Sequence, residues 1–446
     1  MADILQPGDT ESREMRQAAR DIFLKVLAHC SVESAFERHV FFDRGVLRVA
    51  EDLYDISSYG RVFVVSIGKA AYSMVESLMS RVGPGVGVTG IACGPVPAES
   101  QVFGFRYFVG GHPTPNADSL RAAEAILSGL EFRNQRTLLM FLISGGGSSL
   151  VEKPISDKIS LDDLVKTYQA LVHSGAPIGE INTVRKHLSA VKGGRLALAA
   201  EPAHQVSILI SDVPEGSIDS LASGPTMPDS TTIRQCLEIV EKHELLKKFP
   251  KSVRGIFERG ELQETPKKND PAFARSRWWN ILSSASAQKS AVEQAALGGF
   301  AVEVDNSCDD WDYAKAADHL LKRVRELRKG VSRVCLISAG EVTVKVSGDS
   351  GTGGRNQQFA LYCATKIEGE NIAVLSAGTD GADGNSHAAG AVVDGTTIAR
   401  AHAEGLDVRS ALKRFDATPL FEALSDLVVT GPTGNNIRDL RILLAW

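Results

Sequence analysis

Short runs of apolar residues, rich in β-branched side chains and bounded by Gly or Ser, recur along the chain. They are Val62–Ile67, Leu138–Ile143, Val206–Ile210, Val334–Ile337 and Ile372–Leu375. Because successive residues are apolar, the runs predict strands buried on both faces, as in parallel sheets. Amphipathic stretches at helical spacing separate them. This alternation favours an α/β protein with helices on both sides of its sheets.

A charged segment divides this alternation into two parts. Residues 243–277 hold nine Lys and Arg and three prolines, which is typical of a solvated linker or lid. Beyond it, strands are expected at Trp279–Leu282 and Phe300–Val304, with the helix Ala285–Leu297 between them. We therefore expect two α/β domains, residues 1–270 and 275–446, with the active site in the cleft between them.

Composition and charge exclude several classes of protein. The 446 residues carry a formal net charge of −5, which gives no electrostatic reason to expect nucleic acid or an anionic membrane. No apolar run approaches the roughly 18 residues that span a bilayer. The six cysteines are scattered without C-x-x-C pairs, which indicates reduced thiols rather than disulfides or zinc. We expect a cytoplasmic protein and leave its oligomeric state open.

The 41 glycines include two candidate phosphate-binding motifs. Gly85–Gly90 (GVGVTG) matches G-x-G-x-x-G, but no strand precedes it and a strand-like run follows, so a turn is the better interpretation. The second motif, SGGGSS, directly follows a predicted strand. Its glycines allow backbone N–H groups to converge on an anion, although a tight turn is the alternative. The candidate residues are Ser144, Gly145, Gly146, Gly147, Ser148 and Ser149.

Two other segments of the chain contain basic side chains that could bind an anion. Lys69 follows the strand 62–67 at the start of a predicted helix, where it could meet a phosphate or simply be a surface lysine. The segment NTVRKHLSAVKGG contains Asn182, Arg185 and Lys186, which could bind a carboxylate or phosphate. A solvated helix face is about equally consistent with that segment.

Acidic residues end several predicted strands. Asp212 in SDVPEG can hold Mg²⁺ or accept a hydroxyl proton, or it can serve in a turn or helix cap. In the second half, Arg355 of GTGGRNQQ can grip an anion bidentately. Glu341, Asp380 and Asp383 are further candidates, with a plain Asp-Gly turn as the alternative for the last two. Glycine loops, cations and strand-end carboxylates together suit phosphoryl transfer.

The motifs occur in an order that resembles the class II glycerate 2-kinases, whose C-terminal region is the MOFRL domain. They are GKAA, GGHPTPN, SGGGSS, NTVRKHLSAVKGG, SDVPEG, SGPTMPD, GGRNQQ, SAGTDGADG and GPTGNN. The resemblance spans about residues 18–444. It implies a Rossmann-like parallel sheet in the N-terminal domain and a smaller α/β C-terminal domain, with the MOFRL region at about 331–446.

The resemblance also implies an activity. The family transfers phosphate from ATP, with Mg²⁺, to the 2-hydroxyl of D-glycerate, giving 2-phosphoglycerate and ADP. By motif, the family's catalytic Lys, Asp and Arg correspond to Lys69, Asp212 and Arg355, and Gly145–Ser149 corresponds to its phosphate-contacting loop. Asp212 is the candidate metal ligand. Family members have also been called hydroxypyruvate reductases, so an NAD(P)H-dependent reductase is the alternative, and the failed dinucleotide motif disfavours it.

Overall fold

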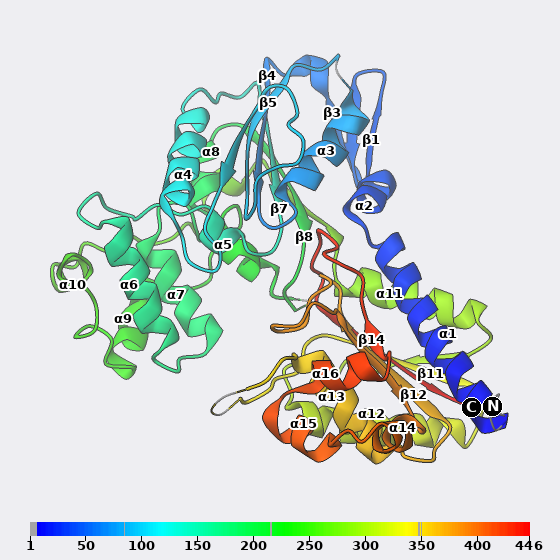
Figure 1. The fold of residues 1–446 in the computed structure, drawn as a ribbon. Helices are drawn as coiled ribbons and strands as arrows, with labels where there is room; N and C mark the ends of the chain where they lie inside the picture. Colours follow the sequence, from blue (N-terminus) through cyan, green and yellow to red (C-terminus); the bar gives the residue numbers. More distant parts are fainter. Residues whose placement is uncertain (1–6, 84, 215, 347, 349) are drawn as a thin grey trace. The chain divides into compact units, whose positions relative to one another are not determined.

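The computed structural model describes residues 7–446 except 84, 215, 347 and 349 (Figure 1). The chain divides into two compact units. The central unit is Ala35–Ile281, and the terminal unit combines the residues up to Ser34 with Leu282–Trp446. No helix among the described residues is long and apolar enough to cross a membrane.

The central unit is built on a six-stranded sheet whose strand order is β6-β5-β4-β7-β8-β9. The pairs from β6 to β8 are parallel. The chain therefore starts in the middle of the sheet, adds strands on one side, and then crosses to the other side, as in Rossmann-like folds. This places a topological switch point between β4 and β7, where ligands bind in such sheets. The strands are β4 (Arg61–Ile67), β5 (Val88–Gly94), β6 (Phe105–Val109), β7 (Thr137–Ile143), β8 (His204–Ile210) and β9 (Ser276–Leu282).

Helices and a small sheet surround these strands. On β4, alternate residues Phe63, Val65 and Ile67 join a core cluster with residues of α4 and α8. A second cluster is formed by α6, α7, α9 and α10. The helices are α2 (Val32–His39), α3 (Ala71–Val82), α4 (Ala117–Leu130), α5 (Gly147–Leu150), α6 (Leu161–Val172), α7 (Ile178–Leu188), α8 (Arg195–Ala200), α9 (Ile233–Lys242) and α10 (Lys251–Glu258). The small antiparallel sheet is β1 (Val40–Asp43), β2 (Val46–Val49) and β3 (Asp52–Asp55).

The interpretation of residues 243–277 as a solvated linker or lid is wrong. The segment contains α10, whose Val253 and Ile256 are buried in the helical cluster of the central unit. Its first residue, Lys251, is exposed. A charge-rich composition therefore conceals an amphipathic helix, because the charges occupy the outward face while the apolar residues recur at helical spacing.

The terminal unit contains the second six-stranded sheet, in the order β10-β11-β15-β12-β13-β14. The runs at 334–337 and 372–375 are strands, but both pair antiparallel with β15, which lies between them. The expected parallel arrangement is wrong for these two pairs, although β10 and β11 are parallel. Strands buried on both faces have the same continuous apolar pattern in either direction. The strands are β10 (Ala301–Val304), β11 (Val334–Ala339), β12 (Ile372–Gly378), β13 (Gly390–Asp394), β14 (Leu427–Val428) and β15 (Asp439–Ala445).

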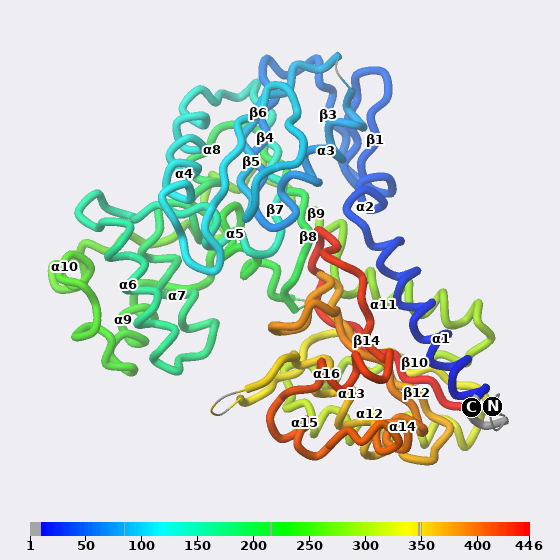
Figure 2. The backbone as a smooth tube through the Cα atoms, in the orientation of Figure 1, coloured from blue at the N-terminus to red at the C-terminus, as the bar shows by residue number. Residues whose placement is uncertain are grey.

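The first helix of the chain belongs to this terminal unit. Figure 2 shows α1 beside α11, and the two helices are in contact. Arg16 forms an ion pair with Asp394, and Arg20 donates a hydrogen bond to the Ser425 carbonyl at 2.8 Å. The helices of this unit are α1 (Pro7–His29), α11 (Ser284–Leu297), α12 (Tyr313–Arg328), α13 (Arg355–Lys366), α14 (Thr397–Ala403), α15 (Val408–Arg414) and α16 (Ala417–Ala423).

Candidate functional site

The loops after β4 and β7 are joined at the switch point of the central sheet. The Lys69 N–H donates to the Gly145 carbonyl at 2.8 Å, and the Ala70 N–H donates to Ser144 Oγ at 3.0 Å. Gly68 has φ +130°, and a Cβ there would lie 2.1 Å from Ser144 Oγ. Only glycine permits so close an approach, so the two predicted loops form one structure.

Asp212 reaches the same structure from the end of β8. A Cβ on Gly145 would lie 1.8 Å from Asp212 Oδ2, so the carboxylate rests against the bare backbone of that glycine. Gly146 has φ +80°, and the position of its missing Cβ is 3.1 Å from Lys69 Cγ. The structure therefore brings Lys69, Asp212 and the 144–149 loop together.

His112 is a further neighbour of this loop, and it is not among the predicted site residues. Its Cδ2 atom lies 3.1 Å from the position of a Cβ on Gly146, beside Lys69. Partial burial lowers the pKa of His112, and the positive charge of Lys69 lowers it further. The GGHPTPN motif was visible in the sequence, and a histidine between glycines and prolines was its only signal.

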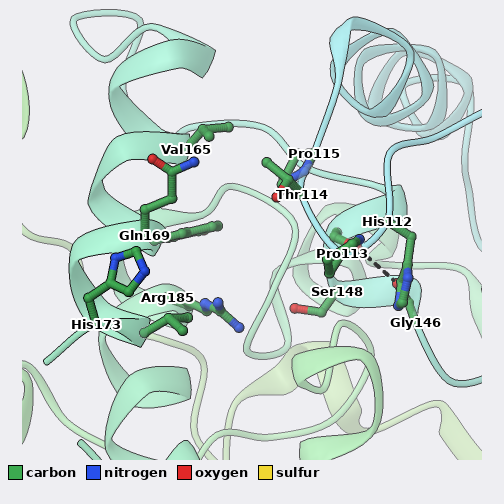
Figure 3. A pocket seen from close by; sticks show the side chains of 13 residues that line it. His112, Pro113, Thr114, Pro115, Gly146, Ser148, Val165, Gln169, His173 and Arg185 are labelled. Atoms are coloured by element: carbon green, nitrogen blue, oxygen red, sulfur yellow. Dashed lines mark hydrogen bonds between the residues drawn. The ribbon is translucent and has the colours of Figure 1, made fainter. Parts of the chain in front are cut away.

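A cavity of about 400 Å³ opens beside the glycine loop (Figure 3). Gly146, Ser148 and Ser149 line it, together with residues 112–115 and one face of α6. Arg185 of α7 points into this cavity, and its guanidinium carbon lies 4.9 Å from the centroid of the Tyr168 ring. Arg185 Nε is buried and has no hydrogen-bond partner among the described residues. Because the Arg185 side chain lines the cavity, its guanidinium can bind an anionic group there.

The neighbours of Arg185 have other partners. The Lys186 side chain is only 6% exposed, and its Nζ pairs with Asp229 at 3.0 Å. Lys192, from the same basic segment, is buried in an ion pair with Glu152. Asn182 precedes Arg185 by one helical turn and is not among the residues that line the cavity. The basic segment is therefore not a solvated face, and of its three candidates only Arg185 reaches the cavity.

The second set of predicted residues lies in the terminal unit. Glu341, Arg355, Asp380 and Asp383 line a cavity of about 530 Å³. Arg355 Nη2 donates to Asp439 Oδ1 at 3.0 Å and pairs with Glu341 at 2.8 Å. Burial alone would lower the pKa of Arg355, but its hydrogen bonds and charge pairing with Asp439 raise it. Arg355 is thus a permanent cation held by acidic neighbours.

Asp383 has a structural function in this set. Its carboxylate accepts the N–H groups of Asn356 at 3.0 Å and Gln357 at 2.8 Å, at the beginning of α13. Burial raises the pKa of Asp383 to about 6, although these hydrogen bonds oppose the shift. Asp380 is only half-buried, and its Oδ1 accepts the Ala382 N–H at 3.2 Å.

No group of three or more His, Cys, Asp or Glu side chains placed to hold a metal occurs in the described part of the chain. A cation at Asp212 would therefore need most of its ligands from elsewhere. Mg²⁺ in phosphoryl-transfer sites commonly has one or two carboxylates, with substrate phosphates and water as its other ligands. Asp212 fits that pattern.

Comparison with known proteins identifies the family. Residues 18–258 match the domain of unknown function DUF4147, and residues 334–439 match the MOFRL family. The D-glycerate 2-kinase of Thermotoga maritima is 36% identical over 94% of this chain and 98% of its own. A protein of Agrobacterium vitis, provisionally named hydroxypyruvate reductase, is 35% identical over 86% of this chain and 87% of its own.

The fold agrees with that result. The crystal structure of Thermotoga maritima glycerate kinase superposes with a TM-score of 0.84 and 33% identity, covering 97% of this chain and all of the other. Together with the shared motifs, this similarity over nearly the whole length shows that the chain belongs to the glycerate kinase family with DUF4147 and MOFRL regions.

Proposed function

We propose that this protein phosphorylates D-glycerate at its 2-hydroxyl with ATP, giving 2-phosphoglycerate and ADP. The observation that carries the proposal is the joined pair of loops at the switch point, which presents Lys69 and Asp212 beside a glycine loop. Relatives named glycerate 2-kinase support it at 35–36% identity.

In the proposed reaction, the 2-hydroxyl oxygen of glycerate forms a bond to the γ-phosphorus of ATP. The bond between that phosphorus and the β,γ-bridging oxygen breaks, and ADP leaves with its electron pair. Asp212 orients the hydroxyl and accepts its proton. Lys69 neutralises charge on the transferring group, and Arg355 is proposed as a further catalytic cation.

The nucleotide is proposed to bring Mg²⁺ with it. As the alternative to its role as base, Asp212 would hold the cation, and the cation would supply charge neutralisation on the phosphates. Asp380 and Glu341 remain proposed nucleotide contacts, because both line the terminal cavity. Asp383 supports them by fixing the beginning of α13.

The glycerate carboxylate is assigned to Arg185. Its guanidinium points into the cavity toward Ser148 (Figure 3), whereas Lys186 is committed to Asp229. Asn182 and Lys186, the other predicted substrate-binding residues, do not line this cavity. Replacement of Arg185 by Lys should raise the KM for glycerate more than it lowers kcat, because the bidentate contact is lost in ground and transition states alike.

A coupled ADP-release assay with glycerate, followed by ³¹P NMR of the product, tests the proposal. Asp212→Asn keeps the shape of the side chain and removes the base, so kcat should fall about a hundredfold or more. An exposed acid on the same unit, Asp162→Asn, is the matched control. Oxidation of NADH by hydroxypyruvate, without ADP release in the first assay, would replace the proposal with the reductase.

A further inference from the structure

The cavity beside the glycine loop is larger than the proposed acceptor needs. At about 30 Å³ per water, its volume of about 400 Å³ holds roughly a dozen waters. Glycerate is a three-carbon acid with an oxygen on every carbon. The Arg185 end of the cavity suits such a molecule, and the remaining space needs another occupant.

The walls of that remaining space are apolar. Val165, Tyr168 and Val172 recur at helical spacing along α6, so they share one face of the helix. Pro113 and Pro115 form the opposite wall, as Figure 3 shows. Two apolar walls that face each other suit a flat ring system and contribute little to binding a small polar acid.

Few polar side chains line the same end. Gln169 extends from α6 between Val165 and His173, opposite Thr114 (Figure 3). Its amide offers one acceptor and two donors, which can bind the edge of a nucleobase. None of the described residues that line the cavity is acidic, so the site is compatible with a nearby polyanion.

The cavity continues directly into the phosphate-binding loop. Gly146, Ser148 and Ser149 line one end of it, and the missing Cβ of Gly146 would lie 3.1 Å from Lys69 Cγ. A nucleotide with its base between α6 and residues 113–115 would therefore direct its phosphates toward the loop and Lys69. Arg185, at the Ser148 end, stays available for the acceptor's carboxylate.

We infer that the space between α6 and residues 113–115 is the nucleoside subsite, with the base of ATP between Val165 and Pro115 and its edge on Gln169. This assignment rests on the proposed kinase function and adds to it the place and orientation of the nucleotide. In this assignment the two ends of one cavity recognise different groups. The Val165 end binds the base, and the Arg185 end binds the carboxylate of the acceptor.

Val165→Trp tests the inference by filling the base end. Val165 is only partly buried on α6, so an indole can be accommodated without disturbing the core. The KM for ATP should rise about tenfold or more, while the KM for glycerate and kcat at saturating ATP change less than about threefold. Gln169→Leu should reduce the preference for ATP over GTP. Leu237→Trp, on the exposed face of α9, is the control and should change neither KM.

Isothermal titration with ADP separates failure of this inference from failure of the kinase proposal. Weaker ADP binding by Val165→Trp than by Leu237→Trp supports the nucleoside subsite even if glycerate is not the acceptor. An increase in the glycerate KM alone would overturn the inference and make the cavity an acid pocket. Unchanged ADP affinity and unchanged KM values in Val165→Trp would also overturn it.

Discussion

The two cavities that contain predicted site residues differ in how their charges are balanced. The cavity of the central unit is lined by Arg185 and two histidines, and none of its described lining residues is acidic. The cavity of the terminal unit is lined by four acidic residues and one arginine. Arg355 is already paired with Asp439 and Glu341, whereas Arg185 Nε lacks a hydrogen-bond partner among the described residues.

This difference indicates different tasks. A cavity whose described lining contains an arginine and no acidic side chain attracts an anion directly. In the terminal cavity an incoming phosphate meets a carboxylate-rich surface and an arginine whose orientation is already fixed. That cavity suits hydroxyl groups or phosphates whose charge is partly neutralised by a cation. The central unit is therefore expected to provide most of the anion affinity.

The largest expected effect comes from removing the exposed cation of the central unit. Lys69→Met should lower kcat about a thousandfold, because a charge aimed at the transferring group acts in the transition state. The exposed position of Lys69 implies little change in stability. Lys166→Met, another exposed lysine of this unit, is the control. If Arg355→Met has the larger effect on ATP affinity, the assigned division of tasks between the two cavities is wrong.

A second variant tests the close packing of the glycine loop. Gly145→Ala would place a Cβ 1.8 Å from Asp212 Oδ2, so the loop and the carboxylate must move apart. A displacement of that size should lower kcat about a hundredfold. Gly85→Ala in the G-x-G-x-x-G stretch has no atom within 4 Å of its new Cβ and should retain full activity. Equal activities in the ADP-release assay would contradict the assigned role of the loop.

The site residues that come directly after strands could be predicted from the sequence. Lys69, the 144–149 loop and Asp212 each come just after a buried apolar run, and the carboxyl ends of neighbouring parallel strands lie at one edge of the sheet. The local pattern predicts the strand that each residue follows. The common direction of parallel strands then predicts that these residues lie at one edge of the sheet.

Pairings between distant segments were not predictable in this way. Lys186 binds Asp229, and α1 joins the terminal unit through Arg16 and Asp394, which are 378 positions apart. A local pattern shows that a residue is basic, but it does not show which acid neutralises it after folding. The sequence also does not predict the direction of β15, because its apolar residues are buried whichever way the strand runs.

A smaller effect is expected from the buried acid of the terminal unit. The pKa of Asp383 is raised to about 6 in the folded protein, above its usual value near 4, so folding is favoured by protonation. Its contribution to the free energy of unfolding should therefore fall by ~3 kcal/mol as pH rises from about 4 to about 6, and level off above that. Urea unfolding of Asp383→Asn should lack this slope. An identical slope in both proteins would place the titration elsewhere.

The smallest expected effect is the change in the pKa of His112 when the Lys69 charge is removed. Partial burial lowers the pKa of His112, and the Lys69 ammonium contributes the remainder, so Lys69→Met should raise the pKa without restoring its usual value near 6.5. NMR titration of the imidazole signals measures this, with Lys166→Met as the control. A neutral His112 near pH 7 means that Lys69 supplies its charge without a second cation beside it. A pKa of His112 that is unchanged in Lys69→Met would show that the ammonium points away from the glycine loop, which would weaken its proposed role in binding phosphate.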